Sequence, residues 1–179
     1  MIANERDIRH TGAIEGARRM MTAARTAPKG KGLDIVEIAL IDGDDKERVA
    51  VVMEELAEEK GMKFFLRDAA NLRQAECAVI IGTHSAPLGL DCGHCGYPKC
   101  AVKPDGVPCA INSVDVGIAI GSACATAADL RLDTRVMFSA GLAAERLDLL
   151  PGCRQVYAIL VSASSKNPFF DRKSPQPQS

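Results

Sequence analysis

The sequence has little net charge, no long uninterrupted apolar run, and no apolar N-terminal segment ahead of a cleavage site. Its 22 Lys and Arg against 23 Asp and Glu leave a formal net charge of −1, and without a strongly basic block this argues against nucleic acid as the main partner. The longest apolar stretch is interrupted by Asp115 and Asp129 and is too short to cross a bilayer. We therefore expect a soluble, cytoplasmic protein with no membrane or nucleic-acid partner.

Cysteine, by contrast, is abundant, and it is concentrated in one place. The 179 residues suit a single domain, and four of the seven cysteines lie in an inserted segment, 88–110, as Cys92, Cys95, Cys100 and Cys109. Glycines and prolines interleave with them, so the segment cannot form a helix or a strand. Something other than regular backbone pairing must order it, and a bound metal centre is the natural candidate.

Three kinds of chemistry use cysteines at such spacing. Structural zinc usually takes two short cysteine or Cys/His pairs separated by about a dozen residues or more, and this segment has one such pair. A disulfide framework is typical of small secreted domains, and the odd cysteine total argues against it. Three cysteines close together with a fourth further on is the general pattern of a [4Fe–4S] site. The spacing therefore favours an iron–sulfur cluster, with zinc as the next alternative.

Other candidate ligands have simpler interpretations. Cys77 belongs to an apolar run and is expected to be a buried, inert thiol, although it precedes the cysteine segment and could lie near the cluster. Cys124 sits among small residues, where packing is favoured over competition for the cluster. His94 lies between two ligands and is interpreted as a solvated loop histidine rather than a fifth ligand.

The rest of the chain alternates helical and strand patterns. Apolar periodicity predicts helices over 5–27, 44–60, 112–130 and 137–149, the third with Asn112 or Ser113 as its N-cap. Runs rich in β-branched residues predict strands over 34–41, 77–82 and 155–163. Residues 63–66 fit either a short strand or the start of a helix that continues over 68–76. The pattern indicates an α+β fold.

Two features suggest close packing against a partner. Glycine costs a helix about 1 kcal/mol relative to alanine, so Gly117 and Gly121 imply close approach of another helix, a second subunit or a flat ligand. The pair Phe169 and Phe170 in the tail is expected to clamp onto the body or onto a second subunit. We expect a homodimer, with residues 173–179 disordered.

Basic residues between glycines offer a candidate anion site. Lys29 and Lys31 alternate with Gly30 and Gly32, so their segment could approach a phosphate closely. A solvated turn is the simpler alternative.

Read together, GLDCGHCGYPKC, GVPC, VDVGIAIGSACATAAD, LDTRVMFSAGLAA and SSKNPFFDR resemble a bacterial and archaeal family of unknown function described as containing a ferredoxin domain. The resemblance covers residues 10–172. It implies that Cys92, Cys95, Cys100 and Cys109 are the four cluster ligands, the set already indicated by their spacing.

The chain is also similar, more weakly, to flavin-dependent nitroreductases, through AARTAPKGKGLDIVEIALI and the alanine-rich segment 115–130. This similarity implies a nitroreductase-like sheet packed with helices, and a dimer with FMN at its interface. Basic residues near both termini contact the FMN phosphate in that family, and Lys29, Lys31, Lys166 and Arg172 lie in comparable places. The arginine-rich segment that precedes the first helix in nitroreductases has no clear counterpart.

Two functions remain. One is an oxidoreductase in which a [4Fe–4S] cluster passes single electrons to FMN for two-electron chemistry on a small substrate; no acid–base residue stands out for that step. The other is a non-catalytic electron carrier or cluster-based sensor, which the missing FMN phosphate motif favours. A redox partner protein is compatible with either.

Overall fold

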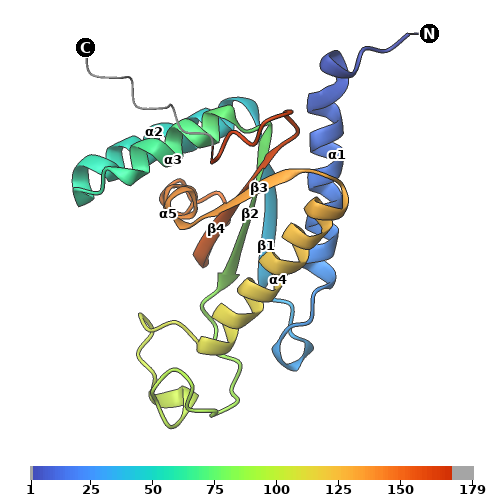
Figure 1. Cartoon of the computed structure of the whole chain (residues 1–179). Helices are drawn as coiled ribbons and strands as arrows, with labels where there is room; N and C mark the ends of the chain where they lie inside the picture. The colour runs from blue at the N-terminus through green and yellow to red at the C-terminus, as the bar shows by residue number, and fades with distance from the viewer. Residues whose placement is uncertain (1, 171–179) are drawn as a thin grey trace.

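A four-stranded antiparallel sheet forms the centre of the molecule, which a computed structural model describes over residues 2–170 (Figure 1). The strand order is β1-β2-β4-β3, so the sequence-distant β2 and β4 are neighbours. The strands are β1 (Val36–Ile41), β2 (Cys77–His84), β3 (Asp133–Met137) and β4 (Cys153–Ser162). The segment 173–179, expected to be disordered, lies outside the described residues.

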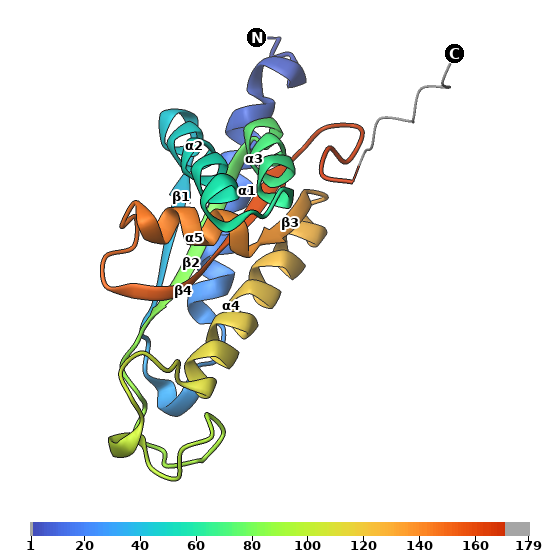
Figure 2. The same cartoon turned by 90° about the vertical axis from the view of Figure 1, so that its left-hand side faces the viewer.

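Helices cover both faces of this sheet (Figure 2). On one face, α1 (Glu5–Thr26) and α4 (Ala110–Asp129) pack against each other and against the sheet. The other face is covered by α2 (Gly43–Lys60), α3 (Phe64–Gln74) and α5 (Phe138–Arg146). Because both faces are covered, seven of the eight residues of β2 are buried, which explains its nearly continuous apolar sequence.

Local sequence signals fix several helix ends. Asp42 caps α2, accepting a hydrogen bond from the Gly43 N–H at 2.6 Å. Gly61 ends the same helix in the left-handed region at φ 66°, a conformation that glycine adopts without steric cost. Ala27, which precedes Pro28, leaves the helical region and ends α1 as predicted.

The structure confirms the α+β class and corrects the sequence-based prediction in two places. It begins α4 at Ala110 with Cys109 as N-cap, so the predicted caps Asn112 and Ser113 lie inside the helix. The side chain of Asn112 instead donates to the carbonyls of His84 and Ala86. Strand β3 had not been predicted, because its DTRVM sequence is short and polar at its start. Residues 64–74 are helical, which settles the ambiguous start of α3.

The tail folds back onto the body, as its phenylalanine pair predicted. Phe169 is 4% exposed and belongs to the core on the α5 face. Its carbonyl accepts a hydrogen bond from the Arg135 guanidinium at 2.8 Å, and the same guanidinium lies 4.9 Å from the ring centroid of Phe170. This places the C-terminal segment against β3.

One helix of the described chain, α4, is long and apolar enough to cross a membrane by length and composition alone, which corrects the expectation that this stretch is too short. Its buried residues pack on α1 and the sheet, with Ser122 donating to the Ala23 carbonyl at 2.9 Å. The opposite face is also apolar, with Val114 and Ile118 54% and 39% exposed. An added Cβ at Gly117 or Gly121 would meet nothing within 4 Å, so the fold of one chain does not explain these glycines.

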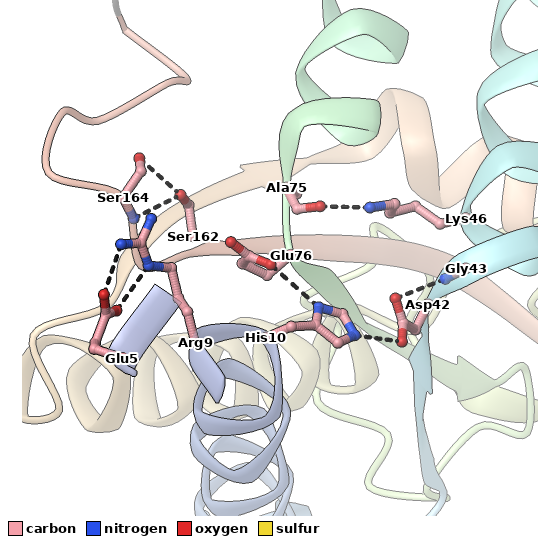
Figure 3. A network of polar contacts seen from close by, with 10 residues as sticks. All are labelled: Glu5, Arg9, His10, Asp42, Gly43, Lys46, Ala75, Glu76, Ser162 and Ser164. Atoms are coloured by element: carbon pink, nitrogen blue, oxygen red, sulfur yellow. Dashed lines mark hydrogen bonds and ion pairs between the residues drawn. The ribbon is translucent and has the colours of Figure 1, made fainter. Parts of the chain in front are cut away.

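A histidine bridge ties the first half of α1 to the sheet, at the end where β1 stops and β2 starts (Figure 3). The two ring nitrogens of His10 lie 3.1 Å from Glu76 Oε2 and 2.9 Å from Asp42 Oδ2. Hydrogen bonds to Glu76 and then to Asp42 raise the pKa of His10 above its usual 6.5, because both carboxylates favour the imidazolium.

This bridge predicts a pH-dependent stability. A raised folded-state pKa gives stability that is fully present below about pH 6.5 and is lost as pH rises through the folded-state pKa. The urea unfolding midpoint should therefore fall between pH 6 and pH 9, and His10→Gln should reduce that fall. Thr11→Ala, an exposed neighbour on the same helix, should retain it. An unchanged fall in the His10→Gln protein would contradict the assignment.

Candidate metal centre

The four predicted ligands line one cavity. The loop that carries them connects the end of β2 to the start of α4 (Figure 1). Cys109 is buried, Cys95 and Cys100 are half-buried and Cys92 is exposed. The intervening segment has no strand and only one short 3₁₀ turn, Cys100–Val102. All four cysteines that the sequence indicated therefore line the same cavity, and their role as ligands stays a prediction.

Tight turns shape this loop. Asp91, Gly93 and Gly96 all have left-handed backbones, with φ of 48°, 74° and 87°, and the Gly96 N–H donates to the Gly93 carbonyl at 2.9 Å. Asp91 Oδ1 accepts a hydrogen bond from the Cys100 N–H at 2.7 Å, which ties the two ends of the ligand run together. His94 is exposed and its Nδ1 lies 3.1 Å from the Cys92 carbonyl, consistent with a loop histidine.

Positive electrostatic features face the cavity. Cys109 is the N-cap of the 20-residue helix α4 and makes no side-chain capping bond, so its sulfur lies at the positive end of the helix dipole. Lys103 also lines the cavity and is only 9% exposed, with its ammonium donating to the carbonyls of Pro104 and Val107. Both features place positive charge beside the cysteine loop.

The donor set fits an iron–sulfur cluster in chemistry, whereas the four sulfurs are not arranged around a metal-sized site in this structure. The shared cavity measures about 10 Å³, and within residues 2–170 no three His, Cys, Asp or Glu side chains are close enough to hold a metal ion. Gly89, Gly93, Gly96 and Gly106 have open space around them, because an added Cβ would meet nothing within 4 Å. The loop is therefore unobstructed on its outer side.

The other three thiols have the character of inert packing residues. Burial raises the pKa of Cys77 to about 12, and it also raises the pKa of Cys124 and of Cys153. Cys77 lies at the start of β2, at the far end of that strand from the cysteine loop. The predictions that Cys77 is a buried thiol and that Cys124 packs are consistent with this placement.

The candidate phosphate contacts do not converge within one chain. Lys29 Nζ donates to the Ala24 and Arg25 carbonyls at the end of α1, and Lys31 Nζ donates to the Leu88 carbonyl at 3.0 Å, beside the cysteine loop. Lys166 follows β4 and lies at the opposite end of the sheet. The eight residues of β2 separate these ends by about 25 Å, at roughly 3.3 Å per residue. Arg172 lies outside the described residues.

The Lys29–Gly32 segment has a structural role that sequence reasoning missed. Both carboxylate oxygens of Asp115, which is 3% exposed, accept from the Gly30 N–H at 3.0 Å. A Cβ at Gly30 would lie 2.7 Å from side-chain atoms of both Ile111 and Leu88. Glycine is therefore needed here for the close approach to α4. Gly30 and Asp115 are 85 positions apart in the sequence, so no local pattern predicts this contact.

Structural comparison first defines the class of fold. The chain is similar to a nitroreductase with bound FMN from Desulfitobacterium hafniense (TM-score 0.57, 13% identity, 92% of this chain and 82% of that one). It is similar to an FMN-dependent nitroreductase from Clostridium difficile (0.55, 19%, 91% and 80%). A third similar structure, NfrA2 from B. megaterium, gives 0.57 and 18%, with 90% of this chain covering 61% of that one. The fold is nitroreductase-like, as predicted, and is carried by a chain shorter than these structures.

Sequence comparison then gives the family. An uncharacterized protein from Archaeoglobus fulgidus is 39% identical over 182 residues, which cover 96% of this chain and 98% of that protein. The profile of a family described as uncharacterized proteins containing a ferredoxin domain matches residues 105–172. The chain belongs to this family. The ferredoxin domain in the family's description indicates a redox protein.

Proposed function

We propose that this protein is an iron–sulfur oxidoreductase that holds a [4Fe–4S] cluster on Cys92, Cys95, Cys100 and Cys109. The observation that carries the proposal is that all four cysteines line one cavity at the N-terminus of α4. When bound, such a cluster supplies single-electron transfer. The chain's own residues would hold it: α4 fixes Cys109, Asp91 positions the backbone of Cys100, and Lys103 would supply positive charge nearby.

An electron carrier or cluster-based sensor is the alternative function. Its support is the separation of the basic residues, since one phosphate cannot contact both Lys31 and Lys166 of a single chain. The visible spectrum of protein purified without oxygen separates the two functions. A broad shoulder near about 400 nm alone indicates the carrier or sensor, and additional flavin bands indicate the oxidoreductase.

A homodimer is the assembly that the exposed face of α4 supports. Val114, Gly117, Ile118 and Gly121 form an apolar stripe with no polar residue between them on that face, and small residues let two helices pack closely. Light scattering at micromolar concentration should report the mass of two chains. Ile118→Asp should shift the mass to one chain, while Val51→Asp, at an exposed valine on α2, should not. A wild-type monomer at every concentration would contradict the dimer.

FMN binding is the second part of the proposed function, and its phosphate should dominate recognition. Charge-assisted contacts contribute about 1.5 to 3 kcal/mol each, so FMN should bind while riboflavin scarcely does. Lys31 and Lys166 lie too far apart to contact the same phosphate, so we expect residues at only one end of the sheet of a given chain to bind it. Either Lys31→Ala or Lys166→Ala should therefore weaken FMN at least tenfold, or about 1.4 kcal/mol, with iron content unchanged. Arg172→Ala is expected to weaken FMN by a similar factor. Fluorescence quenching measures this.

Absence of FMN binding at about 100 µM, a free energy near −5.5 kcal/mol, would leave the carrier or sensor function. Equal affinity for FMN and riboflavin would show that none of these basic residues holds the phosphate.

A further inference from the structure

In the described part of the chain, the cysteine loop is hydrogen-bonded to the rest of the molecule only near its ends. The hydrogen bonds that residues 89–108 make all stay inside the loop, such as those from the Cys100 N–H to Asp91 and from the Lys103 ammonium to the Val107 carbonyl. The chain enters the loop from β2 and leaves it through Cys109, the N-cap of α4. Contacts that join these two ends therefore set the position of Cys109 relative to the other three cysteines.

Asn112 joins the two ends directly. It lies in the first turn of α4, and its side-chain NH₂ group donates to the carbonyls of His84 and Ala86 at 3.3 and 2.9 Å, where the chain leaves β2. Asn112 is 1% exposed, so water does not compete for these two carbonyls. Its amide oxygen is buried and has no partner among the described residues. The amide therefore acts only as a donor, in an orientation that is fixed because the reverse one would set its oxygen against two carbonyl oxygens.

Two neighbours of Asn112 attach the same part of α4 to other elements. Ser113 Oγ donates to Gln155 Oε1 at 2.6 Å, which ties the helix to β4. Gln155 makes this contact from a left-handed backbone, φ 52°, at the irregularity in the pairing of β4 with β2, a conformation that is strained for a residue other than glycine. Asp115 accepts from the Gly30 N–H. The start of α4 is thus fixed to three separate parts of the fold.

We propose that Asn112 is a positioning residue for the cysteine site: it closes the base of the loop and holds Cys109 beside the other three cysteines before any metal binds. Cys109 is buried at this base, whereas Cys92, on the loop, is exposed. Bringing the ends of a flexible loop together costs conformational entropy. Contacts that close the loop during folding relieve metal binding of that cost. Closure does not require a metal, and only its benefit to an iron–sulfur cluster rests on the proposed function.

The test is the rate at which iodoacetamide alkylates each cysteine of the reduced, chelator-treated full-length protein, followed by peptide mass spectrometry. Asn112→Leu keeps nearly the shape of the side chain and removes both donations. The rate at Cys109 relative to that at Cys153, a buried thiol outside the loop, should rise at least about tenfold, because two hydrogen bonds that close the loop are lost. The exposed Cys92 should react at its wild-type rate.

Ser122→Ala is the matched control. It removes another side-chain hydrogen bond from α4 to a backbone carbonyl, that of Ala23, but roughly three turns further along the helix. It should lower the urea unfolding midpoint and leave the ratio of the Cys109 rate to the Cys153 rate unchanged.

Gln155→Gly is a second variant that should fold like the wild type, because glycine adopts the left-handed backbone without strain. Its urea unfolding midpoint should be retained, while the ratio of the Cys109 rate to the Cys153 rate should rise at least about threefold through loss of the bond to Ser113. A residue that only stabilised the fold would move the midpoint and not this ratio.

An equal ratio in wild-type and folded Asn112→Leu protein would overturn the proposal, and so would an equal rise in Ser122→Ala. If Asn112→Leu does not fold, an unchanged ratio in Gln155→Gly overturns it. Iron, sulfide and zinc are measured on the untreated samples. Wild-type protein that holds zinc would contradict the iron–sulfur cluster, while the alkylation ratios would still decide the role of Asn112.

Discussion

Replacing Cys109 with Ala is expected to remove the cluster from anaerobically purified protein. Cys109 is the buried ligand at the N-terminus of α4, so its loss removes the thiol that the fold positions most rigidly. Cys92 is exposed and lies on the loop, and Cys92→Ala should either abolish the cluster or convert it to one with fewer irons. Iron and acid-labile sulfide per chain, together with the visible spectrum, measure the outcome.

Matched controls come from the thiols outside the loop. Cys153→Ala and Cys124→Ala should leave the iron content unchanged, because burial holds the pKa of both thiols above its usual value and disfavours the thiolate that a metal requires. Full cluster content in Cys109→Ala, or its loss in Cys153→Ala, would show that the ligand set is misassigned.

Gly141→Ala should destabilise the whole fold, the second large effect that we expect. Gly141 lies in α5 against β4, and an added Cβ would sit 1.8 Å from the Val156 carbonyl oxygen and 2.8 Å from the Tyr157 Cα. Both obstacles are backbone, so no side chain can rotate away. Overpacking of this kind costs about 3 kcal/mol or more, equivalent to a fall of roughly 6 to 12 °C in Tm for a domain of this size.

Gly12→Ala is the matched control for that substitution. Gly12 lies in α1, and an added Cβ there would meet nothing within 4 Å. Alanine should therefore stabilise the helix by about 0.5 to 1 kcal/mol. Thermal unfolding of the two variants should move Tm in opposite directions. A Gly141→Ala protein as stable as the wild type would show that α5 does not approach β4 so closely.

The sequence predicted the helices and the buried strands well, because their signals are local. The apolar run of β2 and the Asp42 and Gly61 ends of α2 are visible within a few residues. Strand β3 was missed because it is a five-residue strand that gains its stability by pairing with β4. The N-cap of α4 was misplaced because Asn112 satisfies carbonyls of another element, which local capping rules do not include.

The features of the site can also be divided into those with local sequence signals and those without. The four cysteines could be proposed as ligands from the sequence because ligand spacing is a property of a short segment, and the structure adds that all four line one cavity. A second cavity, lined by His84, Glu145 and Arg154, could not be predicted, because strand pairing that the sequence does not display brings these residues together. The basic residues were grouped as phosphate contacts by analogy with nitroreductases. In the structure, Lys31 and Lys166 lie at opposite ends of the sheet.

Metal and sulfide analysis of wild-type protein purified without oxygen tests the central claim most directly. A four-thiolate cubane predicts about four irons and four acid-labile sulfides per chain, with little zinc. Stoichiometric zinc without acid-labile sulfide would contradict the iron–sulfur assignment and would make the cysteine loop a zinc site.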